Sequence, residues 1–516
     1  MCCAYIYASL WGVINSFYGI MNISPKALPP LIFTVRLFPE ITIKSPSVRK
    51  RWTKHLCENI RVLARRVEPR TSVVQDWDRI EVRVPGADAS ARVGMIDLLA
   101  RIPGIANYSE VKSFKFDSLE DIYQRAHQAW ADELPGKTFC VRVKRVGHHD
   151  FTSTQAEVFI GGELNQNVQT AGVKLKNPDI TVHIEIKNHQ FFIVDGKYAG
   201  LGGFPMGTQE SVLSLVSGGF DSTVASYMMI KRGIRTHYCF FNLGGRAHEV
   251  AVKEVAYYLW QKYASTHRVR FITVPFEGVV KEIMEKVDPS NMGVILKRMM
   301  LRAADKVAEK GGIEALVTGE AVAQVSSQTI PNLSIIDRVT EKLTLRPLIV
   351  TDKMDIIKVA RQIGAEGFSA SIPEYCGVIS VKPSARVKLS SIERDEELFD
   401  FDVLDEALGG CRVQFIDQLM KGVGDEVAIE KVSELPDGAI VIDIRHPDER
   451  ELRPLAVADH PLLCIPFYTL DGELVNLDAE ACYYLFCERG VMSELHAGHF
   501  HDAGLRNVAV YRPDLT

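Results

Sequence analysis

The sequence contains no CxxC pair, and its ten cysteines are spread without regular spacing over 516 residues. A secreted disulfide scaffold and a structural zinc site both depend on such spacing, so neither class is supported and reduced thiols are the default. The sequence also lacks a GxxxxGK[ST] motif, which argues against a kinase-like or GTPase-like phosphate loop. A special cysteine or a nucleotide site must therefore be found from its local setting.

Charged side chains are absent from residues 1–25. The stretch from Cys3 to Met21 is long enough to span a bilayer, but it contains serine, glycine and asparagine, and it lacks a basic segment and a clear cleavage site. We expect residues 1–30 to be a disordered extension or to precede the true start, in preference to a membrane anchor. We therefore expect a cytoplasmic protein without membrane association.

The net charge of −5 hides an asymmetry along the chain. Lysines and arginines greatly outnumber acidic residues between Arg36 and Arg66, whereas the stretch from Glu393 to Glu406 is dense in acid. A chain with this polarity could dock a polyanion through its N-terminal part, and a solvated helix face explains the basic run equally well. The length predicts about three or four domains.

Hydrophobic periodicity predicts two α+β blocks in the first 200 residues. The first, at 31–110, has the order of a ferredoxin-like unit. Its expected elements are a strand at 31–38, a helix at 47–67 capped by Ser47, a pair of strands within 71–84 and a helix at 89–100. The second block, at 111–200, resembles a THUMP domain, an RNA-binding module. Its expected elements are helices at 119–131 and 153–167 and strands at 138–145, 180–187 and 190–194.

The most informative stretch is SVLSLVSGGFDS, from Ser211 to Ser222. An apolar run reads as a buried strand, and it breaks into two glycines before a helical pattern begins. Gly218 and Gly219 allow a sharp turn close to an anion, and the helix that follows offers unpaired N–H groups. A carboxylate at Asp221 beside phosphates makes sense mainly if Mg²⁺ lies between them. SGGFDS resembles the pyrophosphate loop of ATP pyrophosphatases.

Strands and helices alternate after this loop, which predicts a parallel sheet covered on both faces, in a nucleotide domain at 206–395. Lys297 lies on a predicted helix, where it could reach phosphates. Gly319 follows a predicted strand, in a second loop whose backbone could come close to a ligand. Gln328 could recognise adenine in that loop. From the residues alone, a surface lysine and a loop glutamine are the more common interpretations. Lys353 begins another helix. Cys376 lies in a loop that suits an accessible thiol, although a buried structural cysteine is the more common case.

An acidic connector at 396–433 leads to a final unit at 434–516. Its strands and turns resemble a rhodanese-like domain, with Cys487 in a loop whose N–H groups converge on the sulfur and favour a thiolate or persulfide. Cysteine-based phosphatases need an arginine six residues later, and this chain has Ser493 there. Histidines at 496, 499 and 501 lack partner ligands for a metal site.

Four stretches together resemble the bacterial tRNA 4-thiouridine synthetase family: LFPEITIKS at 37–45, SGGFDS, the Cys376 loop and the Cys487 loop. The resemblance covers the chain from about residue 31 to its end. It implies a multidomain α+β and α/β fold, with ferredoxin-like and THUMP regions, an ATP pyrophosphatase domain and a rhodanese-like domain.

The resemblance also implies an activity. Uridine 8 of tRNA is adenylated by ATP with Mg²⁺, and a persulfide on Cys487 then delivers sulfur, leaving a Cys376–Cys487 disulfide. Asp221 and Lys353 would assist adenylation. The implied partners are tRNA, a cysteine desulfurase, the sulfur-carrier protein of thiazole synthesis for thiamine, and a thiol or ferredoxin reductant. No tightly bound prosthetic group is expected, and a homodimer is compatible with the pattern. The implied ATP contacts are Leu215, Val216, Ser217, Gly218, Gly219, Ser222, Lys297, Gly319 and Gln328.

Two other functions remain open at this point. An ATP pyrophosphatase acting on a small molecule would leave the basic N-terminal blocks and the sulfur domain without a role. A sulfur carrier without RNA activity would leave SGGFDS without one. RNA binding and pyrophosphate release distinguish these alternatives.

Overall fold

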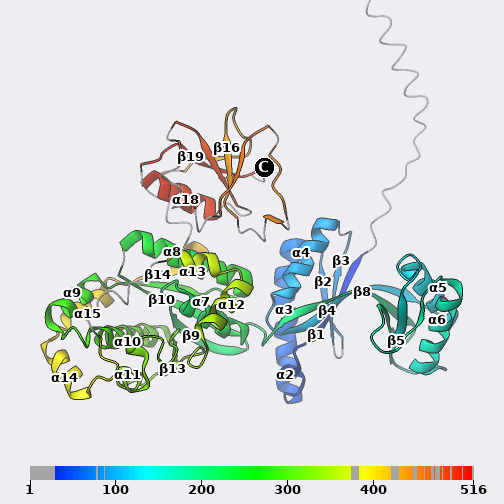
Figure 1. Ribbon diagram of the computed structural model, residues 1–516, viewed down its shortest axis with the longest axis horizontal. Coiled ribbons are helices and arrows are strands. Elements are labelled where there is room, and N and C mark those ends of the chain that lie inside the picture. Colours follow the sequence, from blue (N-terminus) through cyan, green and yellow to red (C-terminus); the bar gives the residue numbers. More distant parts are fainter. Residues whose placement is uncertain are drawn as a thin grey trace, which may run out of the picture.

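The computed structural model describes residues 30–76, 79–86, 88–243, 245–372, 383–419, 429–445, 450–451, 453–457, 459–466, 470, 477–478, 480–487, 491–502 and 504–513. The predicted extension at 1–30, apart from its last residue, and Cys376 lie outside these ranges. The described residues form three β-sheets, with helices packed on them (Figure 1). None of the helices in the described ranges combines the length and the apolar character that a membrane crossing requires.

The first sheet has eight strands in the order β2-β3-β1-β4-β8-β7-β5-β6. The long strands β4 and β8 pair antiparallel along their whole length, so the two expected N-terminal blocks share one sheet (Figure 1). The strands are β1 Leu31–Leu37, β2 Ser72–Asp76, β3 Arg79–Val84, β4 Ile105–Lys115, β5 Thr138–Val146, β6 Gly172–Val173, β7 Ile180–Lys187 and β8 Gln190–Gly202. The helices are α2 Pro39–Thr42, α3 Pro46–Val67, α4 Ala89–Ala100, α5 Leu119–Trp130 and α6 Ser153–Asn167.

The predicted ferredoxin-like order of elements is confirmed, with one correction at a helix start. Helix α3 begins at Pro46 and has Ser45 at its N-cap position, so the predicted cap at Ser47 is wrong. Proline suits the first helical position because its φ is already helical and its missing N–H is not needed there. The helix buries an apolar stripe that includes Leu56 and Ile60 in the core of this unit.

Part of the basic N-terminal run serves contacts inside the protein. Glu185 on β7 accepts from Arg36 on β1 at 2.9 Å and from Arg79 on β3 at 2.7 Å, which ties the two blocks together. Arg66 donates to the hydroxyl and the carbonyl of Ser265 in the next domain, both at 2.9 Å. These arginines therefore contribute less to an outward-facing positive surface than their number suggests.

The second sheet has six strands in the order β13-β12-β9-β10-β11-β14. All pairs are parallel except β11–β14 at one edge, which confirms the predicted parallel sheet. The strands are β9 Gln209–Leu215, β10 Ile234–Asn242, β11 Arg270–Pro275, β12 Ala315–Val317, β13 Leu343–Leu345 and β14 Arg412–Phe415. Since β14 pairs with β11, the beginning of the expected connector at 396–433 is folded onto this sheet.

Helices cover both faces of the second sheet. One hydrophobic core joins the sheet to α9, α10 and α15, and two others join it to α7, α8 and α12. The α-helices are α7 Phe220–Lys231, α8 Gly245–Leu259, α9 Glu277–Lys286, α10 Met292–Gly311, α11 Ile330–Ile336, α12 Lys353–Gln362, α13 Glu366–Ser371, α14 Leu389–Leu398 and α15 Asp402–Gly409. Short helical turns are η1 Trp260–Ala264, η2 Ser326–Gln328, η3 Asp337–Val339 and η4 Ile416–Gln418.

The third sheet forms the C-terminal unit and has five parallel strands in the order β15-β19-β18-β16-β17. Its elements are β15 Lys431–Val432, β16 Ile440–Asp443, β17 Leu462–Cys464, β18 Tyr483–Phe486, α18 Val491–Asp502 and β19 Val508–Tyr511. Cys487 directly follows the central strand β18, so its thiol lies at the carboxyl edge of a parallel sheet, where ligand sites of such sheets are found.

Candidate active site

The SGGFDS segment forms the turn between a central strand and a helix. Strand β9 ends at Leu215, α7 begins at Phe220, and Gly219 occupies the N-cap position. Gly218 has a φ of +81°, a left-handed conformation that favours glycine. A Cβ at Gly218 would lie 2.4 Å from Cδ1 of Ile372, so a side chain would also clash there. The backbone can therefore face an anion at the start of α7.

Hydrogen bonds within the loop hold its shape. Oγ of Ser222 accepts from the backbone N–H of Ser217 at 3.2 Å, and the two hydroxyls lie 3.2 Å apart. Nε2 of His248, on α8, lies 3.3 Å from the carbonyl oxygen of Ser217. Burial lowers the pKa of His248, and the contact with the carbonyl opposes that shift in part. A neutral imidazole donating to this carbonyl keeps the loop fixed without adding charge.

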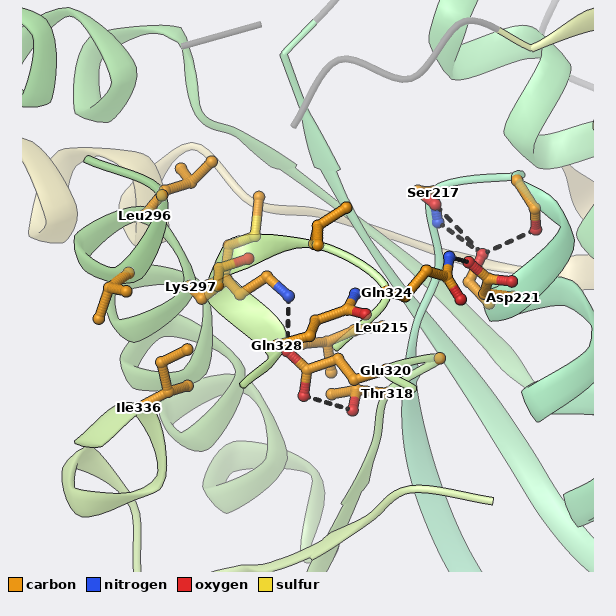
Figure 2. Close-up of a pocket in the computed structure, with 18 of the residues that line it drawn as sticks. Leu215, Ser217, Asp221, Leu296, Lys297, Thr318, Glu320, Gln324, Gln328 and Ile336 are labelled. Atoms are coloured by element: carbon orange, nitrogen blue, oxygen red, sulfur yellow. Dashed lines mark hydrogen bonds and ion pairs between the residues drawn. The ribbon is translucent and has the colours of Figure 1, made fainter. Parts of the chain in front are cut away.

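A cavity of about 520 Å³ opens beside the loop, a volume in the range of small-molecule sites. Figure 2 shows Leu296 and Ile336 on one side of it, and Ser217 and Asp221 on the other. The apolar side can hold a base and the loop side can hold phosphates. The apolar lining residues are Leu215, Val216, Phe220, Phe241, Leu243, Val294, Leu296, Met300, Leu301, Val325, Ile336 and Pro383.

Most of the predicted nucleotide contacts line this cavity. Gly319 lies just after the end of β12, in the second loop that the sequence predicted. A Cβ on Gly319 would lie 2.5 Å from the carbonyl carbon of Asp221, so this loop packs directly against the start of α7. Gly218 shapes the turn and is not among the lining residues that the structure describes. The predicted contacts in the lining are Leu215, Val216, Ser217, Gly219, Ser222, Lys297, Gly319 and Gln328.

Asp221 meets Lys353 at the phosphate side of the cavity. Nζ of Lys353 lies 2.8 Å and 3.0 Å from the two carboxylate oxygens, so two residues that the sequence paired only by resemblance are in direct contact. Nε2 of Gln324 donates to the same carboxylate at 2.7 Å (Figure 2). Gln324 was not predicted, because a polar side chain in a loop carries no pattern that marks it.

The second network, around Glu320, was also missed. Lys297 and Arg346 each donate to Glu320 at 2.7 Å, and the Thr318 hydroxyl donates at 3.0 Å. Burial alone would raise the pKa of Glu320, but the two cations lower it to about 2. Glu320 therefore remains charged and fixes the Lys297 ammonium in the cavity. Its position directly after Gly319, at the end of a parallel strand, is the signal that could have identified it.

The described side chains near the loop could bind a magnesium ion through a single carboxylate. The described ranges contain no cluster of three or more His, Cys, Asp or Glu side chains suited to a metal. Magnesium commonly takes one or two carboxylates and completes its shell with phosphate oxygens and water. Asp221 could supply that single carboxylate. It would then exchange part of its present contact with Lys353 or Gln324.

Cys487 is the predicted sulfur-bearing residue of the C-terminal unit. Its side chain is buried, and the backbone N–H of Ser493 donates to its sulfur at 3.4 Å. An N–H group at the start of α18 that points at sulfur favours a thiolate or persulfide. The rhodanese-like character of this unit stays a prediction. Cys376 lies outside the described residues, so its pairing with Cys487 stays a prediction as well.

The fold and the loop together define a class. The protein combines a pyrophosphate-loop nucleotide domain with ferredoxin-like and THUMP units. Family models agree: "ThiI ferredoxin-like domain" matches residues 32–109, "THUMP domain" matches 116–194, and "Thiamine biosynthesis protein (ThiI)" matches 207–401.

Curated relatives extend this agreement along the chain. A tRNA sulfurtransferase from Saccharophagus degradans is 63% identical over 481 residues, which cover 93% of this chain and 100% of the relative. One from Escherichia coli O157:H7 is 51% identical over 482 residues, with 93% and 100% covered. A solved 4-thiouridine synthetase in complex with RNA and ATP shares the fold, with a TM-score of 0.65, 24% identity, and 75% of this chain and 100% of that chain covered. This chain belongs to the tRNA sulfurtransferase family.

Proposed function

We propose that this protein is an ATP-dependent tRNA sulfurtransferase that converts uridine 8 of tRNA to 4-thiouridine. The contact of Asp221 with Lys353 at the phosphate side of the cavity carries the proposal, because it provides a carboxylate and a cation where an ATP α-phosphate would react. Membership of the tRNA sulfurtransferase family and the RNA and ATP bound by the similar solved synthetase support the choice of substrates.

The first step is adenylation of the base. Uracil O4 attacks the α-phosphorus of ATP, and pyrophosphate leaves. Lys353 stabilises the negative charge that develops on the α-phosphate, and the N–H groups at the start of α7 bind the departing phosphates. Asp221 would hold Mg²⁺, which offsets phosphate charge when bound. The product has AMP on O4, a far better leaving group than the original carbonyl oxygen.

The second step is sulfur transfer. The terminal sulfur of a Cys487 persulfide attacks C4 of the base, and AMP departs with O4. The Cys376 thiolate then attacks the Cys487 sulfur, so the S–S bond breaks, sulfur stays on the base, and a Cys376–Cys487 disulfide forms. Ile372 lies in one hydrophobic cluster with Cys487 and precedes Cys376 by four residues, which supports this pairing. A thiol or ferredoxin reductant supplies the two electrons for another turnover.

The remaining partners follow from the same chemistry. A cysteine desulfurase would load Cys487, and the ferredoxin-like and THUMP units would hold tRNA by its backbone. The family model named for thiamine biosynthesis supports a second role, in which the same persulfide supplies the sulfur-carrier protein of thiazole synthesis.

Pyrophosphate release tests the proposal. The wild-type protein should release pyrophosphate from ATP only with tRNA, and Asp221→Ala should lose most of this activity. Asp355→Ala, an exposed carboxylate on α12, is the matched control and should behave as wild type. Release without tRNA would favour a small-molecule substrate, and no release at all would favour a sulfur carrier. Mass spectrometry of the tRNA product identifies 4-thiouridine directly.

A further inference from the structure

Helix α8 contacts the phosphate loop. Its His248 lies against the carbonyl of Ser217, and Val252 packs against Gly218, since a Cβ on that glycine would lie 3.1 Å from a Val252 methyl. The left-handed turn at Gly218 therefore has a side chain of α8 as its direct neighbour. A shift of α8 along its axis would therefore displace the loop.

The same helix contacts the C-terminal unit less than one turn further on. Oε1 of Glu254 lies 2.9 Å from Nε2 of His496 on α18, and the two side chains are only 7% and 2% exposed. The pair is a close polar contact whose angles differ from those of a linear hydrogen bond. Val252 and Glu254 are separated by about 3 Å of helix rise, so the loop contact and the C-terminal contact are adjacent.

Apolar side chains surround this polar contact. Val255 on α8, together with Phe368 and Ile372 at α13, belongs to one hydrophobic cluster with the core of the C-terminal unit, including Cys487. In Figure 1 the C-terminal unit lies above α8 and α13. The cluster is continuous from the second sheet's helices to the sulfur-bearing unit.

We propose that α8 and α13 form the docking surface on which the C-terminal unit delivers sulfur, and that the Glu254–His496 contact sets its orientation. This inference rests on the proposed function. Helix α18 begins four residues after Cys487 and its Ser493 N–H points at the sulfur, so a contact that fixes His496 also fixes the N–H group that contacts the Cys487 sulfur. Glu254 and His496 are positioning residues, since neither contacts the reacting atoms.

A buried polar pair inside an apolar interface suits this task. Apolar contacts alone tolerate sliding, whereas a buried polar group costs free energy in every orientation that separates it from its partner. The pair therefore selects one docked geometry among several that bury similar apolar area. The connector that ends at β15 leaves the unit tethered to the nucleotide domain when the contact opens.

The test separates docking from the chemistry of each unit. Full-length Glu254→Gln, His496→Gln and the double variant are compared with wild type in three assays. These are persulfide loading of Cys487 by a cysteine desulfurase, tRNA-dependent pyrophosphate release, and 4-thiouridine formed in a single turnover of loaded enzyme. The first two assays also report whether each unit is folded. Glu494→Gln is the matched control, because Glu494 on α18 binds Lys431 inside the C-terminal unit at 2.8 Å.

Each single variant should slow single-turnover thiolation at least tenfold, with loading and pyrophosphate release within twofold of wild type. The double variant should be no slower than the slower single variant, because both changes remove one contact. The inference would be overturned if the single variants thiolated tRNA at the wild-type rate, or if their losses multiplied in the double variant. Parallel losses in all three assays would also overturn it. Failure of the wild-type protein to form 4-thiouridine would overturn the proposed function itself, which is a separate result.

Discussion

Glu320→Gln tests the buried network that holds Lys297 in the cavity. Glu320 is almost fully buried between Lys297 and Arg346, and its pKa is lowered to about 2 from an ordinary value near 4.5. A shift of this size corresponds to roughly 3 kcal/mol of stabilisation at neutral pH. Removing one partner of a buried ion pair costs about 3–5 kcal/mol, so this value agrees with the one obtained from the pKa shift. We expect Glu320→Gln to lower the stability of the nucleotide domain by about 3 kcal/mol at pH 7.

The sign of the pH dependence follows from the lowered pKa. The stabilisation is present above the unfolded-state pKa near 4.5 and is lost as pH falls toward 2. The difference in free energy of unfolding between wild type and variant should therefore shrink to about half by pH 3. Urea titrations with pulsed hydrogen exchange on α10 peptides measure this difference. Glu309→Gln is the control on α10, the helix that carries Lys297, because Glu309 is exposed. A pH-independent difference, or one below about 1 kcal/mol at pH 7, would refute the reasoning.

Two further predictions concern the glycine loop and the cysteines. Gly218→Ala should weaken ATP binding at least tenfold in calorimetry, because of its positive φ and the clash with Ile372. Gly278→Ala on α9 is the control and should bind normally, since a Cβ there would meet nothing within 4 Å; equal affinities of the two variants would contradict this. Cys487→Ser should abolish persulfide loading, and Cys376→Ser should load but stop after one turnover; persulfide labelling of Cys487→Ser at the wild-type level would refute this division of roles.

The sequence predicted the fold where patterns are local. The apolar strand before SGGFDS, the glycines of the turn and the alternation of strands and helices are all read within short windows, and the parallel sheet matches them. It did not predict that β4 and β8 would join two blocks into one sheet, because pairing between strands far apart in the chain leaves no local periodicity.

Site residues divide in the same way. Ser217 and Gly219 are found from one hexapeptide, and Asp221 is found with them. Glu320 and Gln324 acquire their roles only when distant segments meet: Glu320 between two cations, and Gln324 against Asp221. A single polar residue in a loop has no periodicity and no spacing rule, so nothing in the sequence marks Gln324, and the only signal for Glu320 is its place directly after Gly319 at the end of a parallel strand.

The charge balance around the cavity shows which groups must hold a triphosphate. Lys353 binds Asp221, and Lys297 binds Glu320, so the cationic side chains identified at the site already have carboxylate partners. These two lysines therefore offer little net attraction for an anion, and among the described groups the N–H groups at the start of α7 are a source of attraction that no carboxylate neutralises. Those groups face the cavity only if the turn at Gly218 keeps its left-handed shape. For that reason loop geometry should matter more for ATP affinity than any one lysine.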